Sequence, residues 1–132
     1  MKQTDELTKV GMEVMNKLED GLAERVTSSL SQLDEGLSKL VTDYAFGAVV
    51  ARPGLDLKTR EMITVASLIS LGNARPQLEL HMRAAINVGV TPKELLEIVI
   101  QMAIYAGVPA CMNGIIAYRA TMESIEQNKS NL

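Results

Sequence analysis

The chain contains a single histidine, His81, in a segment that has the pattern of an amphipathic helix. On a 3.6-residue period, His81 shares one stripe with apolar side chains, namely Leu78, Ala84, Ala85 and Val88. Histidine exchanges protons near neutral pH, so an imidazole with small alanines beside it is a candidate general acid or base. A histidine on an apolar helix face is also commonly a packed core residue. Both interpretations of His81 stay open.

Two arginines flank the turn that precedes the most apolar segment of the chain. Arg52 and Arg60 stand on either side of the Pro53-Gly54 turn. A guanidinium group can hold a carboxylate through two parallel hydrogen bonds, so either arginine could bind an acidic ligand. Arg60 could instead form a surface ion pair with Asp56 or Glu61.

A polar stripe also crosses an otherwise aliphatic helix near position 100. Tyr105 follows Gln101 by four residues and Glu97 by eight, so the three side chains share a face. This stripe suits either a pocket wall or a hydrated subunit interface.

The cysteine count limits the remaining chemistry. The lone Cys111 excludes an intramolecular disulfide and any metal site built on a cysteine pair. Its apolar neighbours favour an inert, buried thiol. No histidine and carboxylate occur at metal-ligand spacing, and no glycine-rich phosphate loop or dinucleotide motif is present. We therefore expect neither a metal ion nor an organic cofactor.

Composition favours a helical protein. The 132 residues are 47% hydrophobic but only 3% aromatic, so the core must be aliphatic. No strand-like alternation of any length appears, and the length suits one domain over residues 1–132. The net charge of −3 and the pI of about 5.2 give no reason to expect binding to nucleic acid or to an anionic membrane. We predict an all-α single-domain bundle.

Turn and cap signals divide the chain into about six or seven helices. The third should bury Leu37, Leu40, Val41, Tyr44 and Ala45, and the fourth should be central and largely enclosed. The sixth has the clearest start, a capping box formed by Thr91 and Glu94. The predicted spans are 4–20, 26–33, 34–51, 57–73, 75–88, 92–106 and 110–127, with a frayed tail at 128–132.

The distribution of charged and apolar residues also predicts the cellular compartment of the protein and its assembly. The charged start leads into an amphipathic segment, so we expect no signal peptide and a cytoplasmic, reducing compartment. Residues 98–118 carry no charge, but Gly107 and Pro109 interrupt this run, which favours two helices over a membrane span. Several helices are apolar over more than a third of their circumference, which indicates burial between subunits and therefore a homo-oligomer.

Four blocks of sequence resemble the carboxymuconolactone decarboxylase family. They lie at 44–47 (YAFG), 52–60 (RPGLDLKTR), 81–91 (HMRAAINVGVT) and 104–110 (IYAGVPA). The resemblance implies an alkylhydroperoxidase D-like helical subunit, a ring-shaped trimer or hexamer, and a pocket near His81. One branch of the family uses a Cys-x-x-Cys pair just before the histidine. Ala74 and Gln77 stand at those positions, so a dithiol peroxidase mechanism is excluded there.

The other branch converts 4-carboxymuconolactone to 3-oxoadipate enol-lactone and CO2 without a cofactor. The resemblance then implies that His81 is the hydrogen-bond donor to the lactone oxygen or the acid that protonates the enolate. It also implies that Arg52 and Arg60 hold carboxylates of a small lactone-like substrate, and that Gln77 or Tyr105 adds a polar contact. The decarboxylases usually carry a tryptophan and an acidic residue within the segment 47–50. This chain has Ala48 and Val50 there, which changes a pocket lining and so the expected substrate.

Two other functions remain as alternatives to a decarboxylase. The second hypothesis is a non-catalytic oligomer that keeps the fold and binds a ligand in the same pocket. A thiol antioxidant acting through Cys111 is the third hypothesis.

Overall fold

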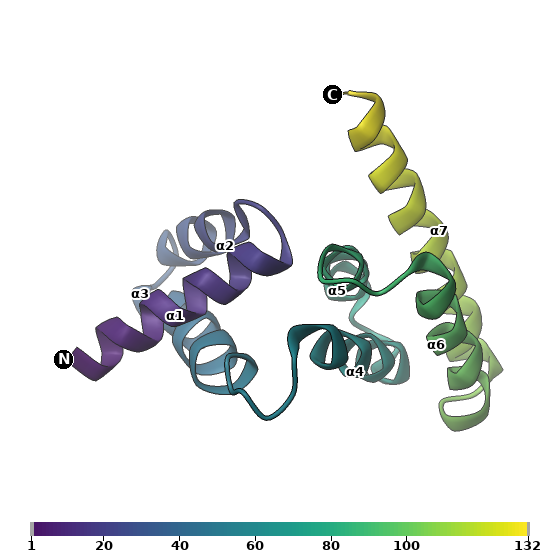
Figure 1. The fold of residues 1–132 in the computed structure, drawn as a ribbon, viewed down its shortest axis with the longest axis horizontal. Helices are drawn as coiled ribbons and strands as arrows, with labels where there is room; N and C mark the ends of the chain where they lie inside the picture. Colours follow the sequence, from purple (N-terminus) through teal and green to yellow (C-terminus); the bar gives the residue numbers. More distant parts are fainter. Residues whose placement is uncertain (1, 132) are drawn as a thin grey trace. The chain divides into compact units, whose positions relative to one another are not determined.

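The computed structural model describes residues 2–131, and all the secondary structure in this range is helical, as predicted (Figure 1). The chain divides into two compact units, one ending at Leu57 and the other beginning at Lys58. We describe each unit by itself below. A single domain over residues 1–132 stays a prediction.

The N-terminal unit contains four helical elements. They are α1 (Lys2–Leu18), α2 (Leu22–Ser31), α3 (Glu35–Lys39) and the π-helix η1 (Leu40–Val50). Its buried apolar side chains come from the C-terminal half of α1 and the start of α2, namely Val14, Met15, Leu18, Leu22 and Ala23. The Asp34 side chain accepts a hydrogen bond from the Gly36 backbone N–H at 2.7 Å and so caps α3.

The predicted face of the third helix is wrong. From Leu40 onward the helix has π geometry, with the Ala51 N–H bonded to the Phe46 carbonyl five residues earlier. The buried side chains are polar Ser38, Thr42 and Asp43, whereas the predicted apolar residues Leu40 and Tyr44 are 59% and 64% exposed. Asp43 can be buried because it accepts a hydrogen bond from the Thr8 hydroxyl of α1 at 2.7 Å.

Helices α1 and η1 approach each other closely because two glycines face the partner backbone. A Cβ atom on Gly11 would lie 2.9 Å from the Thr42 carbonyl carbon and still closer to its oxygen. A Cβ atom on Gly47 would similarly overlap the Leu7 carbonyl. Only residues without a side chain fit this crossing.

Replacing Gly11 by alanine should therefore destabilise the protein. Helix propensity alone would favour Gly11→Ala by about 1 kcal/mol, but forcing two backbones apart costs about 1–3 kcal/mol, so the overlap decides the sign. The free energy of unfolding in urea measures the effect. Gly54→Ala is the control, because a Cβ atom there meets nothing within 4 Å. A Gly11→Ala protein more stable than the wild type would contradict this account.

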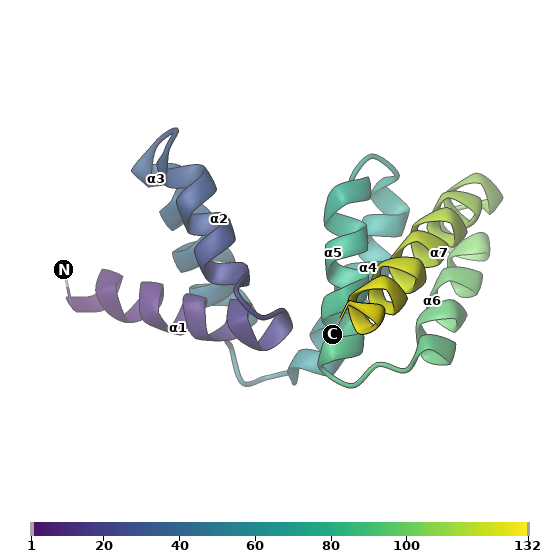
Figure 2. The same ribbon diagram turned by 90° about the horizontal axis from the view of Figure 1, so that it is seen from above.

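The C-terminal unit is built from four α-helices. They are α4 (Leu57–Leu71), which starts at the junction of the units, α5 (Arg75–Asn87), α6 (Pro92–Tyr105) and α7 (Val108–Ser130). Helix α7 packs against both α5 and α6 and runs beside α6 in both views (Figures 1 and 2). The core is aliphatic, as predicted, and contains Val65, Ile69, Leu78, Met82, Ala85, Val90, Leu95, Val99, Met102, Cys111 and Ala117.

Local signals set most helix ends in this unit. The Thr91 hydroxyl accepts from the Glu94 N–H at 3.1 Å, and the Glu94 carboxylate accepts from the Thr91 N–H at 3.0 Å, which confirms the capping box. The hydrogen bond from the Thr91 N–H lowers the pKa of Glu94, and the nearby Lys58 ammonium lowers it further. Gly107, with φ of 97°, separates α6 from α7.

Three predictions for this unit are wrong. Helix α4 is not largely enclosed within the chain, because only Glu61, Val65 and Ile69 are buried while Leu71 is 66% exposed. Helix α7 starts before Ala110, since Pro109 lies in its first turn, where its missing N–H costs nothing. The predicted frayed tail is helical as far as Ser130. None of the helices between residues 2 and 131 has the length and apolar character that a membrane crossing needs.

Candidate functional site

His81 does not stand alone on its helix face, because it is paired with a carboxylate from another helix. The Nδ1 atom of His81 on α5 lies 2.8 Å from Oε2 of Glu61 on α4. The Glu61 side chain is 2% exposed, and the His81 side chain is 16% exposed. A buried acid and a partly accessible imidazole therefore form a dyad.

Glu61 is buried because of its position on α4. Val65 and Ile69 follow it at four and eight residues, and both are fully buried, so Glu61 belongs to the stripe that faces the core. Burial of an unpaired carboxylate costs several kcal/mol, and the hydrogen bond from His81 offsets this cost.

The sequence analysis missed Glu61, which it considered only as a surface partner for Arg60. That interpretation is wrong, since the carboxylate is buried. A signal was present: a single acid occupies the same 3.6-residue stripe as two core residues of a very apolar helix. Such an acid needs a partner inside the fold.

The pairing selects which nitrogen of His81 can act on a ligand. An ionised carboxylate only accepts hydrogen bonds, so Nδ1–H donates to Glu61 in that state. Nε2 is then the ring nitrogen that can exchange a proton with a ligand. When the ring is protonated, Nε2–H can donate its proton to a ligand. The dyad thus has the parts of a general acid or base.

Two other predicted residues lie on the same pair of helices. Gln77 is one turn before His81 on α5, on the same face, and is exposed. Arg60 precedes Glu61 on α4 and is half-buried. The pair α4 and α5 therefore supplies His81, Glu61, Gln77 and Arg60.

Arg52 and Tyr105 are placed elsewhere in the chain. Arg52 belongs to the N-terminal unit, where it lines a pocket of about 240 Å³ together with Lys17, Asp56 and Val50. Tyr105 is the last residue of α6 and is 76% exposed. Their contact with a substrate stays a prediction.

Cys111 is a free thiol in the core of the C-terminal unit, only 8% exposed. This confirms the expectation of a buried thiol.

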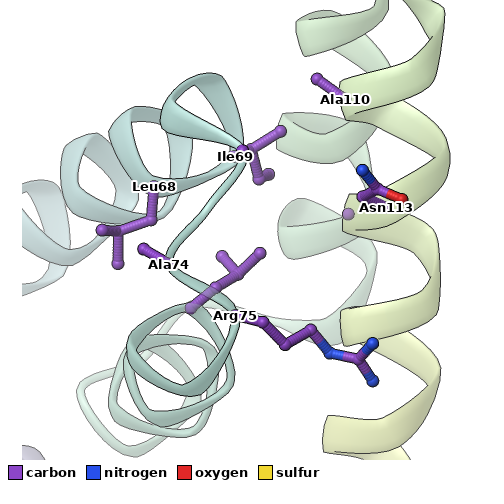
Figure 3. A pocket seen from close by; sticks show the side chains of 9 residues that line it. Leu68, Ile69, Ala74, Arg75, Ala110 and Asn113 are labelled. Carbon is purple, nitrogen blue, oxygen red and sulfur yellow. The ribbon is translucent and has the colours of Figure 1, made fainter.

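The pocket that the resemblance implies near His81 stays a prediction, and His81 does not line another pocket that the C-terminal unit forms. That other pocket has a volume of about 240 Å³ and lies between the end of α4, the start of α5 and the first turns of α7 (Figure 3). Leu78 is the lining residue nearest to His81 in the sequence, one turn earlier on α5. Among residues 2–131, no cluster of three or more His, Cys, Asp or Glu side chains is arranged to hold a metal ion.

Comparison with known proteins agrees with the resemblance noted in the sequence. Residues 35–120 match the family model described as "Carboxymuconolactone decarboxylase family". The chain is 36% identical to a 4-carboxymuconolactone decarboxylase of Acinetobacter baylyi over 103 residues, which cover 77% of this chain and 76% of the relative.

Two further relatives extend the comparison. A nitrosuccinic acid decarboxylase of Metarhizium robertsii is 40% identical over 87 residues, covering 66% of this chain and 60% of the relative. An uncharacterised 15.0 kDa protein of Paracoccus denitrificans is 37% identical over 71 residues, or 53% of each chain. The family match spans well over half of the sequence and includes both members of the His81–Glu61 dyad, so the chain belongs to the carboxymuconolactone decarboxylase family.

Proposed function

We propose that the protein is a cofactor-independent decarboxylase in which the His81–Glu61 dyad supplies the proton. The hydrogen bond between these side chains carries the proposal, because it couples a buried acid to the one histidine of the chain. Two relatives named as decarboxylases support the reaction type.

The two names point to one class of substrate. A carboxylated lactone and a nitro-substituted diacid both carry an electron-withdrawing group near a carboxylate. When the bond to CO2 breaks, its electron pair can move onto an oxygen of that group, giving an enolate or a nitronate. We infer that the substrate is a small acid of this kind.

The dyad then completes the reaction. Nε2–H of the protonated His81 ring gives its proton to a carbon of the enolate or nitronate, and the neutral imidazole regains a proton from water. In a nitronate this is the carbon that lost CO2, whereas in a conjugated lactone the double bond moves and the proton goes to the carbon next to the lactone carbonyl. Glu61 accepts from Nδ1–H throughout, which holds the imidazole ring in one orientation. The cycle consumes one proton and releases one CO2, so atoms and charge balance.

We propose that two arginines bind the carboxylates of the substrate. Arg60 is adjacent to Glu61 on α4, and Arg52 shares its pocket with Val50. Val50 belongs to the segment in which the decarboxylases usually carry a tryptophan and an acidic residue. An aliphatic side chain leaves more room beside Arg52 and offers no stacking surface. We propose that this difference shifts the preferred acid away from 4-carboxymuconolactone itself.

The proposal includes assembly of several copies of the chain into a ring. Ile104, Tyr105 and Val108 are each more than 60% exposed in the single subunit. Large apolar side chains grouped along the end of α6 and the start of α7 are typical of surfaces that another subunit covers.

The test is release of CO2 from 4-carboxymuconolactone and from nitrosuccinate by the purified protein, with each acid alone as the blank. We expect turnover of at least one acid. In D2O the product should carry one deuterium, at the carbon that lost CO2 for nitrosuccinate and at the carbon next to the lactone carbonyl for 4-carboxymuconolactone. No release above the blank from either acid would overturn the proposed reaction for this class of substrate.

A further inference from the structure

We propose that the pocket beside α7 is a second binding site, separate from the dyad, for a small carboxylate with an apolar body. The pocket lies at the C-terminal end of α4, whereas Glu61 lies seven residues before Leu68, the first α4 residue of the lining. Seven residues correspond to about 10 Å along a helix. The α4 part of the lining therefore begins about two helical turns from the acid of the dyad.

The walls of the pocket are mostly hydrocarbon. Leu68, Ile69 and Leu78 supply branched side chains, and Ala74 and Ala110 supply methyl groups (Figure 3). The volume of about 240 Å³ corresponds to that of about eight water molecules in the liquid. Such a lining favours a short aliphatic body over a polar one.

Polar groups are confined to two side chains of the lining. Figure 3 shows Arg75 extending from α5 toward α7 and Asn113 projecting from α7. Arg75 uses Nε to bind Oε2 of Glu79 at 2.7 Å, which leaves the two Nη atoms of the fork for another acceptor. The amide of Asn113 provides a further donor.

The charge at the pocket selects an anion. The lining contains one cation, Arg75, and no acidic side chain. The first turn of the 23-residue helix α7 contributes Ala110 to the wall and adds the positive end of the helix dipole. A carboxylate bound by Arg75 and Asn113 would leave its hydrocarbon part among the leucine and isoleucine side chains.

Hexanoate is a suitable probe, because it combines a carboxylate with a short aliphatic body. We expect titration of the ¹⁵N-labelled full chain to shift the amide signals of Ala74, Arg75, Asn113 and Gly114. Hexan-1-ol has the same body without the charge and should bind about tenfold more weakly or worse, since charge-assisted hydrogen bonds are roughly twice as strong as neutral ones. Absence of hexanoate binding, or shifts located elsewhere, would overturn the proposal.

Variants separate this site from the dyad. Arg75→Gln, at an exposed side chain, should weaken hexanoate binding about tenfold or more. Glu79→Gln should bind at least as tightly as the wild type, because it removes the competing carboxylate. Ala110→Leu should block the pocket, and its amide spectrum reports whether the fold is intact. Equal binding by the wild type, Arg75→Gln and Ala110→Leu would refute the site.

The same titration on His81→Gln distinguishes this inference from the proposed function. That variant should bind hexanoate as the wild type does, since His81 does not line the pocket. The pocket can therefore be confirmed even if the decarboxylation test fails, and the reverse also holds.

Discussion

Replacing His81 by glutamine is expected to lower kcat for decarboxylation by about 10²- to 10⁴-fold, the usual contribution of a positioned acid or base. Glutamine keeps a polar side chain of similar reach and can still hydrogen-bond to Glu61, so the fold should survive. It has no proton to give near neutral pH. Steady-state kinetics on the acid that the wild type turns over measures the effect, with KM determined separately.

Glu79→Gln is the matched control for changes on this helix. Glu79 lies two residues before His81, is paired with Arg75 at the surface, and points away from the dyad. Its kcat should equal that of the wild type. If His81→Gln kept more than a tenth of the wild-type kcat, the imidazole would not be the proton donor.

Replacing Glu61 by glutamine is expected to lower kcat by at least about 10²-fold with little change in stability. The amide can donate to Nδ1 as well as accept from it, so it no longer fixes the proton on Nδ1. The amide has the same shape as the carboxylate and keeps a hydrogen bond to His81, so the change in stability should be small.

Two measurements identify Glu61 as a positioning residue. The ¹⁵N shifts of the His81 ring should show the proton on Nδ1 in the neutral wild type and a mixture of tautomers in Glu61→Gln. Thermal unfolding should show similar Tm values for the two proteins. A large fall in Tm together with an unchanged ring spectrum would instead assign Glu61 a structural role only.

Much of the secondary structure could be predicted from the sequence, because its signals are local. The Thr91 and Glu94 capping box, Pro76 in the first turn of α5, and the glycine that separates α6 from α7 all act within four residues of the helix end that they set. The prediction was wrong over residues 40–50, where two alternative helix types have the same local signals. An α-helix and a π-helix over residues 40–50 have the same composition, and only contact with α1 selects the polar face for burial.

The sequence by itself determined the helical class, the aliphatic core and the family, since composition, periodicity and short motifs carry these properties. It marked His81 only as a candidate site residue. Only the tertiary structure decided that Glu61 is the partner of His81, because the two residues are 20 positions apart and meet through the packing of α4 against α5. It also placed a pocket of the C-terminal unit beside α7, lined by residues from α4, α5 and α7. Pairing between distant residues depends on how helices pack, and neither periodicity nor capping specifies that packing.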